Sequence, residues 1–195
     1  GDTDQLVVAA GRLVRKKGFE FLIDAIAALQ AAWPRLALLL AGSGDLETEL
    51  RQRAARRAVG QNVVFLGAVT QDDVAELLAA ADVIVVPSVR DDAGNVDGLP
   101  NVLLEALASG TPVVTTAAGG MGTVAIDGRT ARVVPARSPQ PLADAIDELL
   151  RRPEYGAQLG RQARSEMRRT HSWAHVAERF EHTYARAAAR SPIAR

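Results

Sequence analysis

Short apolar runs alternate along the chain with longer amphipathic segments, and this alternation limits the fold more than any other feature. The runs are apolar throughout rather than alternately polar and apolar, which is typical of parallel strands covered on both faces. They lie at Leu6–Ala10, Leu36–Ala41, Val63–Leu66, Val83–Val86, Pro112–Thr115 and Arg132–Val134. The pattern predicts an α/β fold: a doubly wound, Rossmann-like parallel sheet of about six strands with flanking helices.

The segments between the runs carry the periodicity and the end signals of helices. Apolar residues recur at helical spacing from Phe19 to Leu29, and Thr70 with Asp73 resembles a capping box. Pro34 is expected to end the first helix. The expected helices span residues 19–33, 46–59, 71–81, 101–108, 141–151, 154–169 and 172–189.

The composition excludes several classes of protein. There is no cysteine, which excludes disulfides, thiolate catalysis and cysteine-rich zinc sites. The 23 Lys and Arg residues balance 23 Asp and Glu residues, and aromatic residues are only 4% of the chain, so we expect no nucleic-acid partner. No apolar run is long enough to span a bilayer. Because the chain begins at Gly1 and reaches a strand almost at once, we expect it to be a piece of a longer protein.

A basic loop from Gly11 to Gly18 follows the first expected strand. It holds four cations in six residues, including both lysines of the chain. Ligands of doubly wound sheets bind beyond the carboxyl ends of the strands, and Arg and Lys charges suit phosphate. These features favour an anion-binding site over a merely solvated basic turn.

Two loops at the same edge carry further glycine signals. Gly42-Ser43-Gly44 resembles the start of a dinucleotide fingerprint, but Glu47 replaces its third glycine, so a tight turn is the preferred interpretation. After the fifth expected strand, the segment 119–122 contains three glycines. Their amides could face a ligand, or the segment could simply be a flexible turn.

The long irregular stretch Ser88–Leu99 precedes a helix with two features of a binding site. The amides of Asn101 and Val102 would be unpaired at its start and would form a phosphate cradle. Glu105 lies one turn further among apolar residues, where a carboxylate is costly unless it is paired or faces a cleft. A ribose diol would satisfy it; the alternative is an exposed face of an amphipathic helix.

The histidines predict no metal site. His171 and His175 are four residues apart, but Ser172 is expected to cap a helix between them and no acid completes a ligand set. Neither a Ser/His/Asp arrangement nor a Walker A pattern is present.

In their order and spacing, these segments resemble a known family. The matching stretches are Gly11–Leu13, Lys17-Gly18, Leu40–Gly44, Val64–Val69, Asp82–Ser88, Gly98–Val114, Gly119-Gly120 and Asp127-Gly128. Nearly the whole chain resembles the C-terminal, donor-binding domain of a retaining glycosyltransferase of family 4, which has the GT-B fold. The resemblance implies one nucleotide-sugar-binding domain over residues 1–195, with residues 172–195 as a C-terminal helix that docks on a missing N-terminal acceptor domain.

The resemblance also implies roles for single residues. Arg12 and Lys17 would neutralise the donor diphosphate without a metal, and Asp97, where the family motif has its first glutamate, would act as the third catalytic residue. Glu105 matches the second acid of that motif, which holds the ribose. The remaining implied donor-binding residues are Gly11, Gly67, Val69, Gly98, Leu99, Asn101, Val102, Gly119, Gly120 and Met121.

The implied function is the donor-binding half of a retaining hexosyltransferase that needs no cofactor. A UDP-sugar is the preferred donor and a GDP-sugar the alternative. A degenerate nucleotide-binding or structural module, and a GT-B relative such as an epimerase or phosphorylase, stay open as alternatives. We expect the chain to be inactive alone and the full-length protein to be cytoplasmic, either free or peripheral at the cytoplasmic membrane face.

The C-terminal tail carries an apolar face that could serve as a contact surface. Trp173, Val176, Phe180 and Tyr184 lie at helical spacing on it, and residues 161–195 contain eight Arg against three Glu. This face would pack on the acceptor domain or, without that domain, on another copy of the chain.

Overall fold

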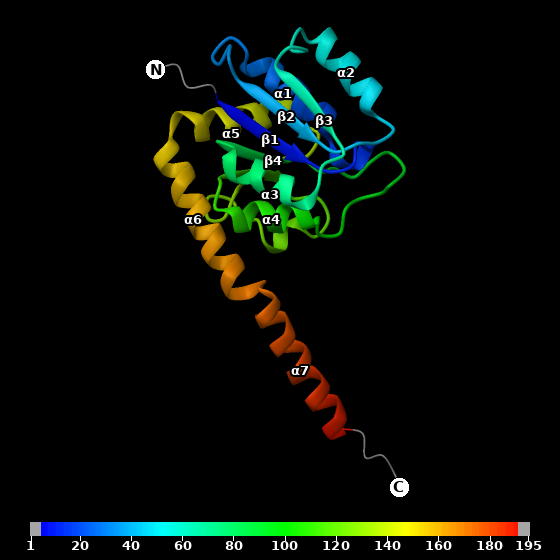
Figure 1. Cartoon of the computed structure of the whole chain (residues 1–195), viewed down its shortest axis with the longest axis vertical. Helices are drawn as coiled ribbons and strands as arrows, with labels where there is room; N and C mark the ends of the chain where they lie inside the picture. Colours follow the sequence, from blue (N-terminus) through cyan, green and yellow to red (C-terminus); the bar gives the residue numbers. More distant parts are fainter. Residues whose placement is uncertain (1–4, 191–195) are drawn as a thin grey trace.

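The computed structural model describes residues 5–190 and contains the predicted parallel sheet. Its strands lie in the order β3-β2-β1-β4-β5-β6, and all neighbouring strands pair in parallel (Figure 1). The strands are β1 Leu6–Ala10, β2 Ala37–Ala41, β3 Val63–Gly67, β4 Val83–Val86, β5 Val113–Thr116 and β6 Arg132–Val134. This is the doubly wound order, and the winding direction reverses between β1 and β4.

The expected helices are all present, with small shifts at their ends. They are α1 Phe19–Leu29, α2 Glu47–Arg56, α3 Gln71–Ala80, α4 Asn101–Ser109, α5 Pro139–Arg151, α6 Pro153–Thr170 and α7 Trp173–Arg190. Short 3₁₀ turns occupy η1 Arg15–Lys17 and η2 Met121–Thr123. The prediction that α1 continues to Pro34 was wrong, because the chain leaves the helix after Leu29.

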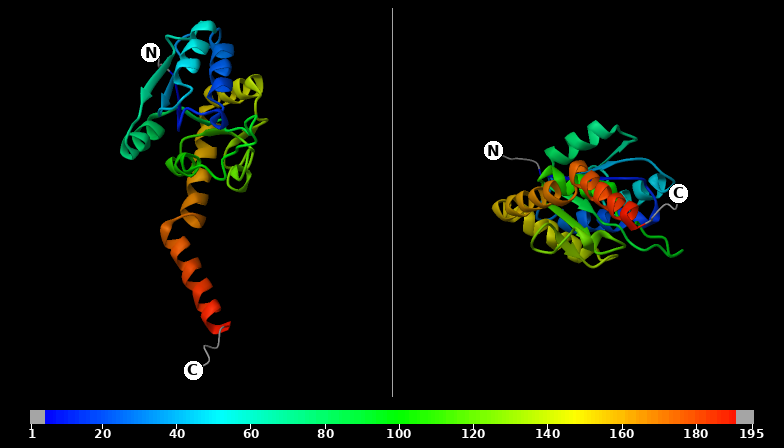
Figure 2. Two further views of the ribbon diagram at one scale, coloured as in Figure 1. Left: turned by 90° about the vertical axis from the view of Figure 1, so that its right-hand side faces the viewer. Right: turned by 90° about the horizontal axis from the view of Figure 1, so that it is seen from below.

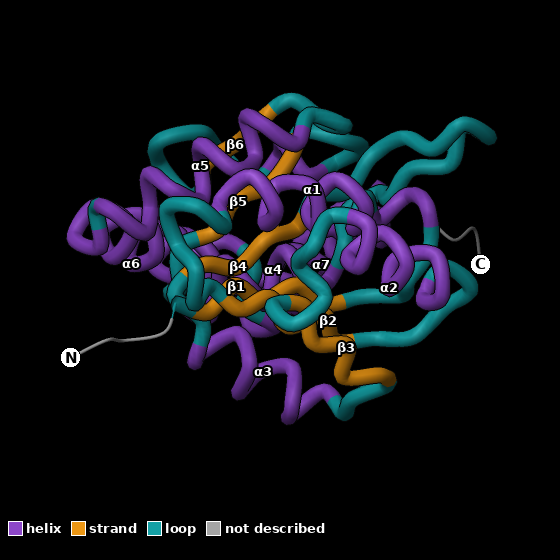
Figure 3. Tube along the Cα trace, turned by 90° about the horizontal axis from the view of Figure 1, so that it is seen from above, coloured by secondary structure: helices purple, strands orange, loops and turns teal. Residues whose placement is uncertain are grey.

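Helices cover both faces of the sheet (Figure 3). Val7 of β1 belongs to a core with residues of α1, α2 and α5, whereas Val8 belongs to a second core with residues of α3, α4 and α6. Successive side chains of a strand point to opposite faces, so each central strand is buried on both sides. This double burial explains why the runs are continuously apolar, and it confirms the predicted fold class.

Helix α7 extends away from the rest of the domain (Figures 1 and 2). Its side chains Trp173, Phe180 and Tyr184 are 88%, 58% and 69% exposed. Residues 191–195 of the expected C-terminal segment lie outside the described residues. Within residues 5–190, no helix combines the length and the apolar character needed to cross a membrane.

The loops that follow β1 and β2 pack tightly against each other through glycine. A Cβ atom on Gly42 would lie 2.0 Å from the carbonyl oxygen of Gly11. The Gly11 amide donates to the Ala41 carbonyl at 2.9 Å, and the Leu13 amide donates to the Ser43 carbonyl at 2.9 Å. Gly42 therefore allows the two loops to approach closely, and the loop after β2 stabilises the loop after β1 through these hydrogen bonds.

Candidate functional site

The basic loop after β1 is locked to the chain that leaves β4. Gly18 has a left-handed φ of 67° between η1 and α1, and a Cβ atom there would lie 2.2 Å from the carbonyl oxygen of Pro87. The Val89 amide donates to the Lys16 carbonyl at 2.8 Å. Because β1 and β4 are neighbours in the sheet, their two loops meet at its carboxyl edge.

Both lysines of the loop converge on one carboxylate. Lys16 Nζ lies 2.9 Å from Asp97 Oδ1, and Lys17 Nζ lies 2.8 Å from Asp97 Oδ2. Ser88 is fully buried, and its hydroxyl donates to Asp97 Oδ2 at 3.2 Å. The structure thus brings the expected Lys17 and Asp97 together. It adds Lys16 and Ser88, which sequence reasoning did not assign; the adjacent pair formed by the chain's only lysines was the signal for Lys16.

The lysines keep Asp97 ionised. Burial raises the pKa of its carboxyl, but the hydrogen bonds and charges of Lys17 and Lys16 outweigh burial and hold the pKa below its ordinary value. A carboxyl whose pKa is lower in the folded state stabilises the protein above its unfolded pKa of about 3.9. That stabilisation is lost as the pH falls through the folded pKa.

The contribution of the Asp97 carboxylate to the free energy of unfolding should therefore decrease as the protein is acidified. We expect the wild-type protein to be more stable than Asp97→Asn near neutral pH, and the difference to shrink below about pH 4. Urea denaturation of both proteins between about pH 3 and about pH 7 measures the difference directly. A difference that stays constant over this range would contradict the ion pairing.

Arg12 lies apart from the lysine–aspartate cluster. Its side chain is exposed, and within residues 5–190 its guanidinium has no hydrogen-bond or ion-pair partner. The amides on either side of it, of Gly11 and Leu13, are bound to the loop after β2. Its backbone is thus fixed at the carboxyl edge, while its charge is not neutralised by the described part of the chain.

The glycine loop after β5 lies directly against residues 97 and 98. A Cβ atom on Gly119 would lie 1.8 Å from the carbonyl oxygen of Asp97. The Gly120 amide donates to the Gly98 carbonyl at 2.5 Å, and the Met121 amide also donates within the loop. The amides of Gly120 and Met121 are therefore engaged inside the chain, and the Met121 side chain is buried. The expected role of these two residues in donor binding stays a prediction. The Gly119 amide has no acceptor among the described residues.

Helix α4 supplies free amides and a half-buried carboxylate. The amides of Asn101 and Val102 have no acceptor within the described chain, as is usual in a first helical turn. Glu105 lines a groove between α3 and α4 together with Gln71 and Ala75. Its carboxylate makes no hydrogen bond or ion pair with residues 5–190. Glu105 is thus half-buried beside a groove, and its role in holding a ribose stays a prediction.

The other expected donor-binding residues lie at the same edge. Gly67 ends β3 with a φ of 71°, and no atom lies within 4 Å of the position of a Cβ atom there. Val69 is half-buried and directly precedes Thr70, the N-cap residue of α3. Gly98 borders open space, and Leu99 packs against the core that contains α4.

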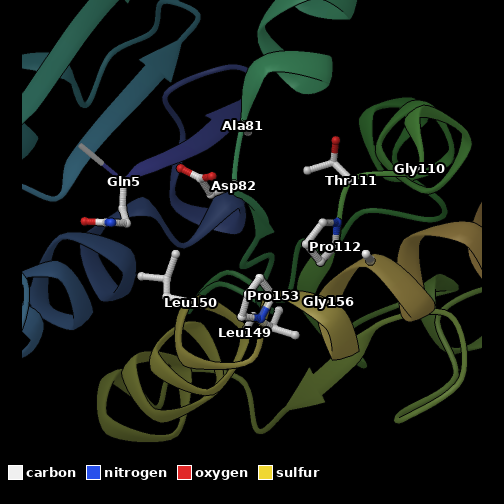
Figure 4. Close-up of a pocket in the computed structure, with 11 residues that line it drawn as sticks. Gln5, Ala81, Asp82, Gly110, Thr111, Pro112, Leu149, Leu150, Pro153 and Gly156 are labelled. Atoms are coloured by element: carbon white, nitrogen blue, oxygen red, sulfur yellow. The ribbon is translucent and has the colours of Figure 1, made fainter. Parts of the chain in front are cut away.

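A second pocket lies at the opposite edge of the sheet (Figure 4). Gln5, Asp82 and Pro112 line it, and they directly precede β1, β4 and β5. The Asp82 carboxylate there accepts a hydrogen bond from the Leu6 amide at 2.7 Å. Ligands of doubly wound sheets bind at the carboxyl ends of the strands, so the candidate site is the edge that holds Lys17 and Asp97. Among residues 5–190, no three His, Cys, Asp or Glu side chains are grouped as metal ligands.

Comparison with known proteins identifies the family. Residues 1–166 match the model of the family described as glycosyl transferases group 1. The chain belongs to this family. The match ends within α6, so α7 of this glycosyltransferase chain lies beyond it.

The relatives agree in sequence and in fold. A protein from Corynebacterium glutamicum, named GDP-mannose-dependent monoacylated alpha-(1-6)-phosphatidylinositol monomannoside mannosyltransferase, is 36% identical over 92% of this chain and 46% of its own length. Sucrose-phosphate synthase from Thermosynechococcus elongatus has a TM-score of 0.83 at 30% identity, covering 96% of this chain and 46% of the other. Anabaena HepE in complex with UDP-glucose has a TM-score of 0.83 at 24% identity, covering 93% and 49%.

These comparisons identify the domain that the chain forms and the share of its relatives' length that it covers. The six-stranded sheet with helices on both faces matches the Rossmann-like domain of GT-B glycosyltransferases. The chain spans about half the length of the curated relatives it matches.

Proposed function

We propose that this chain is the nucleotide-sugar-binding half of a retaining hexosyltransferase that works without a metal. One observation carries the proposal: Lys17, the unneutralised Arg12 and the free amides of Asn101 and Val102 all lie at the carboxyl edge of the sheet. Basic side chains and the start of a helix are the groups that bind phosphate. Membership of the glycosyltransferase family supports the reaction class.

The arrangement suits the departure of a nucleoside diphosphate. Negative charge grows on the diphosphate as its bond to the sugar breaks, and fixed positive groups stabilise that charge in the transition state. Lys17 lies along the loop backbone, because a Cβ atom on Gly11 would be only 3.5 Å from Lys17 Cε. Arg12 is exposed and can move onto the donor. Glu105 has no partner within the described chain, so its carboxylate is free to accept hydrogen bonds from ribose hydroxyls.

A UDP-sugar is the donor we propose, with a GDP-sugar as the alternative. HepE, which shares the fold, has been crystallised with UDP-glucose, whereas the mannosyltransferase relative is named for GDP-mannose. That relative is also named for a phosphatidylinositol-linked acceptor. A lipid-linked acceptor would place the full-length protein at the cytoplasmic face of a membrane; a water-soluble acceptor would leave it free in the cytoplasm.

Calorimetric and thermal-shift titrations with UDP, GDP and ADP, with and without magnesium, test the function. A ligand that binds only the folded state raises its stability by about 2.7 kcal/mol at a hundredfold excess over Kd. We expect one nucleotide to be preferred and magnesium to have no effect. No binding by the full-length protein would instead favour a degenerate module. Efficient sugar transfer by this chain alone would contradict its assignment as one half of the enzyme.

The exposed face of α7 is the surface on which we propose that the remaining part of the protein packs. Trp173, Phe180 and Tyr184 are largely exposed on a helix that extends away from the domain. Large aromatic groups exposed together mark an interaction surface. The relatives are about twice as long as this chain, which supplies the partner: a second domain of the same protein.

Iodide quenching of tryptophan fluorescence tests this contact. Trp33→Phe leaves Trp173 as the only tryptophan. We expect iodide to quench this variant strongly in the present chain and weakly in the full-length protein, because the second domain would cover Trp173. Equal quenching in the two proteins would contradict the contact. Quenching that weakens as the present chain is concentrated would indicate self-association.

A further inference from the structure

The carboxylate of Asp97 pairs with Lys17, which the proposed function assigns to the donor diphosphate, and with the neighbouring Lys16. Each of its oxygens takes one lysine, Lys16 at 2.9 Å and Lys17 at 2.8 Å, and the Ser88 hydroxyl adds a third hydrogen bond. The Asp97 side chain is only 11% exposed, so solvent screens these contacts weakly. The lysine pair is therefore partly neutralised from within the protein.

The surroundings of Asp97 hold it in this position. Its backbone carbonyl packs against Gly119, and the next carbonyl, of Gly98, accepts the Gly120 amide. The hydroxyl of Thr116 donates to the Ser88 carbonyl. This bond fixes the backbone of Ser88, whose hydroxyl donates to the Asp97 carboxylate. Asp97 is thus anchored by the backbone on one side and by two lysines on the other.

We propose that Asp97 is the internal counter-ion of the donor site: it positions Lys16 and Lys17 in the empty site, and the donor diphosphate competes with it for both. This inference rests on the proposed function. Asp97 is then a positioning residue rather than a sugar-contacting one, and Lys16 becomes a second diphosphate ligand beside Lys17. The competition limits the affinity for the nucleoside diphosphate, so it also speeds the release of that product.

The charges of Lys16, Lys17 and Asp97 predict in which direction the Asp97→Asn substitution changes the affinity for a nucleoside diphosphate. Two lysines and one carboxylate leave one net positive charge, and Asp97→Asn would leave two. Asparagine has the same shape and keeps an oxygen that can accept from Ser88. The variant should bind a nucleoside diphosphate about tenfold more tightly, with slower dissociation. Its affinity should also fall more steeply with ionic strength, because more charge takes part in binding.

The experiment is a calorimetric titration of UDP, GDP and their glucose and mannose conjugates into wild-type protein and Asp97→Asn at two salt concentrations. Asp97→Glu keeps the charge and should retain affinity close to that of the wild type. Asp92→Asn is the matched control, because Asp92 is a 93% exposed carboxylate of the same loop that pairs with Arg137. We expect the control to change affinity by less than about twofold.

The outcomes distinguish a counter-ion role of Asp97 from contact with the sugar. Equal or weaker binding of the nucleoside diphosphates by Asp97→Asn would overturn the inference. So would an effect confined to the nucleotide sugars, since that would show contact with the sugar. If the wild-type protein binds no nucleotide, the proposed function fails and the inference fails with it.

A second variant keeps the test valid if Asp97→Asn does not fold. Lys16 is the more exposed member of the lysine pair, with 26% of its side chain exposed. Lys16→Met should weaken nucleoside diphosphate binding about tenfold if Lys16 is a ligand. Unchanged binding would exclude Lys16 from the site and overturn the inference.

Discussion

Replacing Lys17 by alanine is expected to weaken nucleoside diphosphate binding about 30-fold, the largest binding effect of any single change at the site. The ammonium group lies in a largely buried position beside Asp97, where a charge-assisted hydrogen bond is worth about 2 kcal/mol. Its loss would also leave the Asp97 carboxylate with one lysine fewer, so repulsion between that carboxylate and the diphosphate would increase. Calorimetry at fixed ionic strength measures the change.

Arg15→Ala is the matched control for this prediction. Arg15 belongs to the same short turn, but its guanidinium pairs with Glu49 of α2 instead of Asp97 and donates to Glu49 Oε1 at 2.8 Å. Both side chains of that pair are substantially exposed, so the pair contributes little. We expect a change in affinity of less than about twofold. Similar losses in the two variants would mean that the loop acts through its total charge and not through the position of Lys17.

Replacing Gly119 by alanine is expected to lower the free energy of unfolding by about 3 kcal/mol. Gly119 has a φ of 60°, where an alanine costs about 1 kcal/mol by itself. Its Cβ atom would also lie 1.8 Å from the backbone carbonyl oxygen of Asp97, so the two loops must separate. Urea denaturation at neutral pH measures the loss. Because Asp97 would move as well, nucleoside diphosphate affinity should change in the same variant.

Gly122→Ala distinguishes this contact from a general effect on the loop. Gly122 lies three residues further along, in η2, and no atom lies within 4 Å of the position of a Cβ atom there. Its replacement should leave the free energy of unfolding within about 0.5 kcal/mol of the wild-type value. If both variants were destabilised equally, the contact between Gly119 and Asp97 would not be the cause.

The fold could be predicted because its signals are local. Each strand is a short apolar run, and the capping box that begins α3 is visible as Thr70 and Asp73. The end of α1 was placed wrongly because it depends on a distant contact. Beyond Leu29 the chain turns so that the Trp33 indole donates to Asp147 at 2.7 Å, and a sequence pattern does not reveal a partner that far along the chain.

The candidate site was predictable as a set of loops but not as a set of contacts. The strand order places the basic loop and the loop after β4 at one edge, so Lys17 and Asp97 were expected in the same region. Their direct pairing depends on how closely two loops approach, and the glycines at 18 and 119 set that distance. The engaged amide of Gly120 belongs to the same loop packing, which composition alone does not show.

The ion pairs of Lys16 and Lys17 with Asp97 also cross the seam where the sheet changes its winding direction, between β1 and β4. Contacts between residues so distant in sequence form late, because the long loop between them must close first and its closure costs entropy. A chain emerging from the ribosome presents the lysine turn long before the loop that contains Asp97. Nucleotide binding with wild-type affinity therefore reports that both halves of the sheet have joined, which makes it a measure of completed folding as well as of the site.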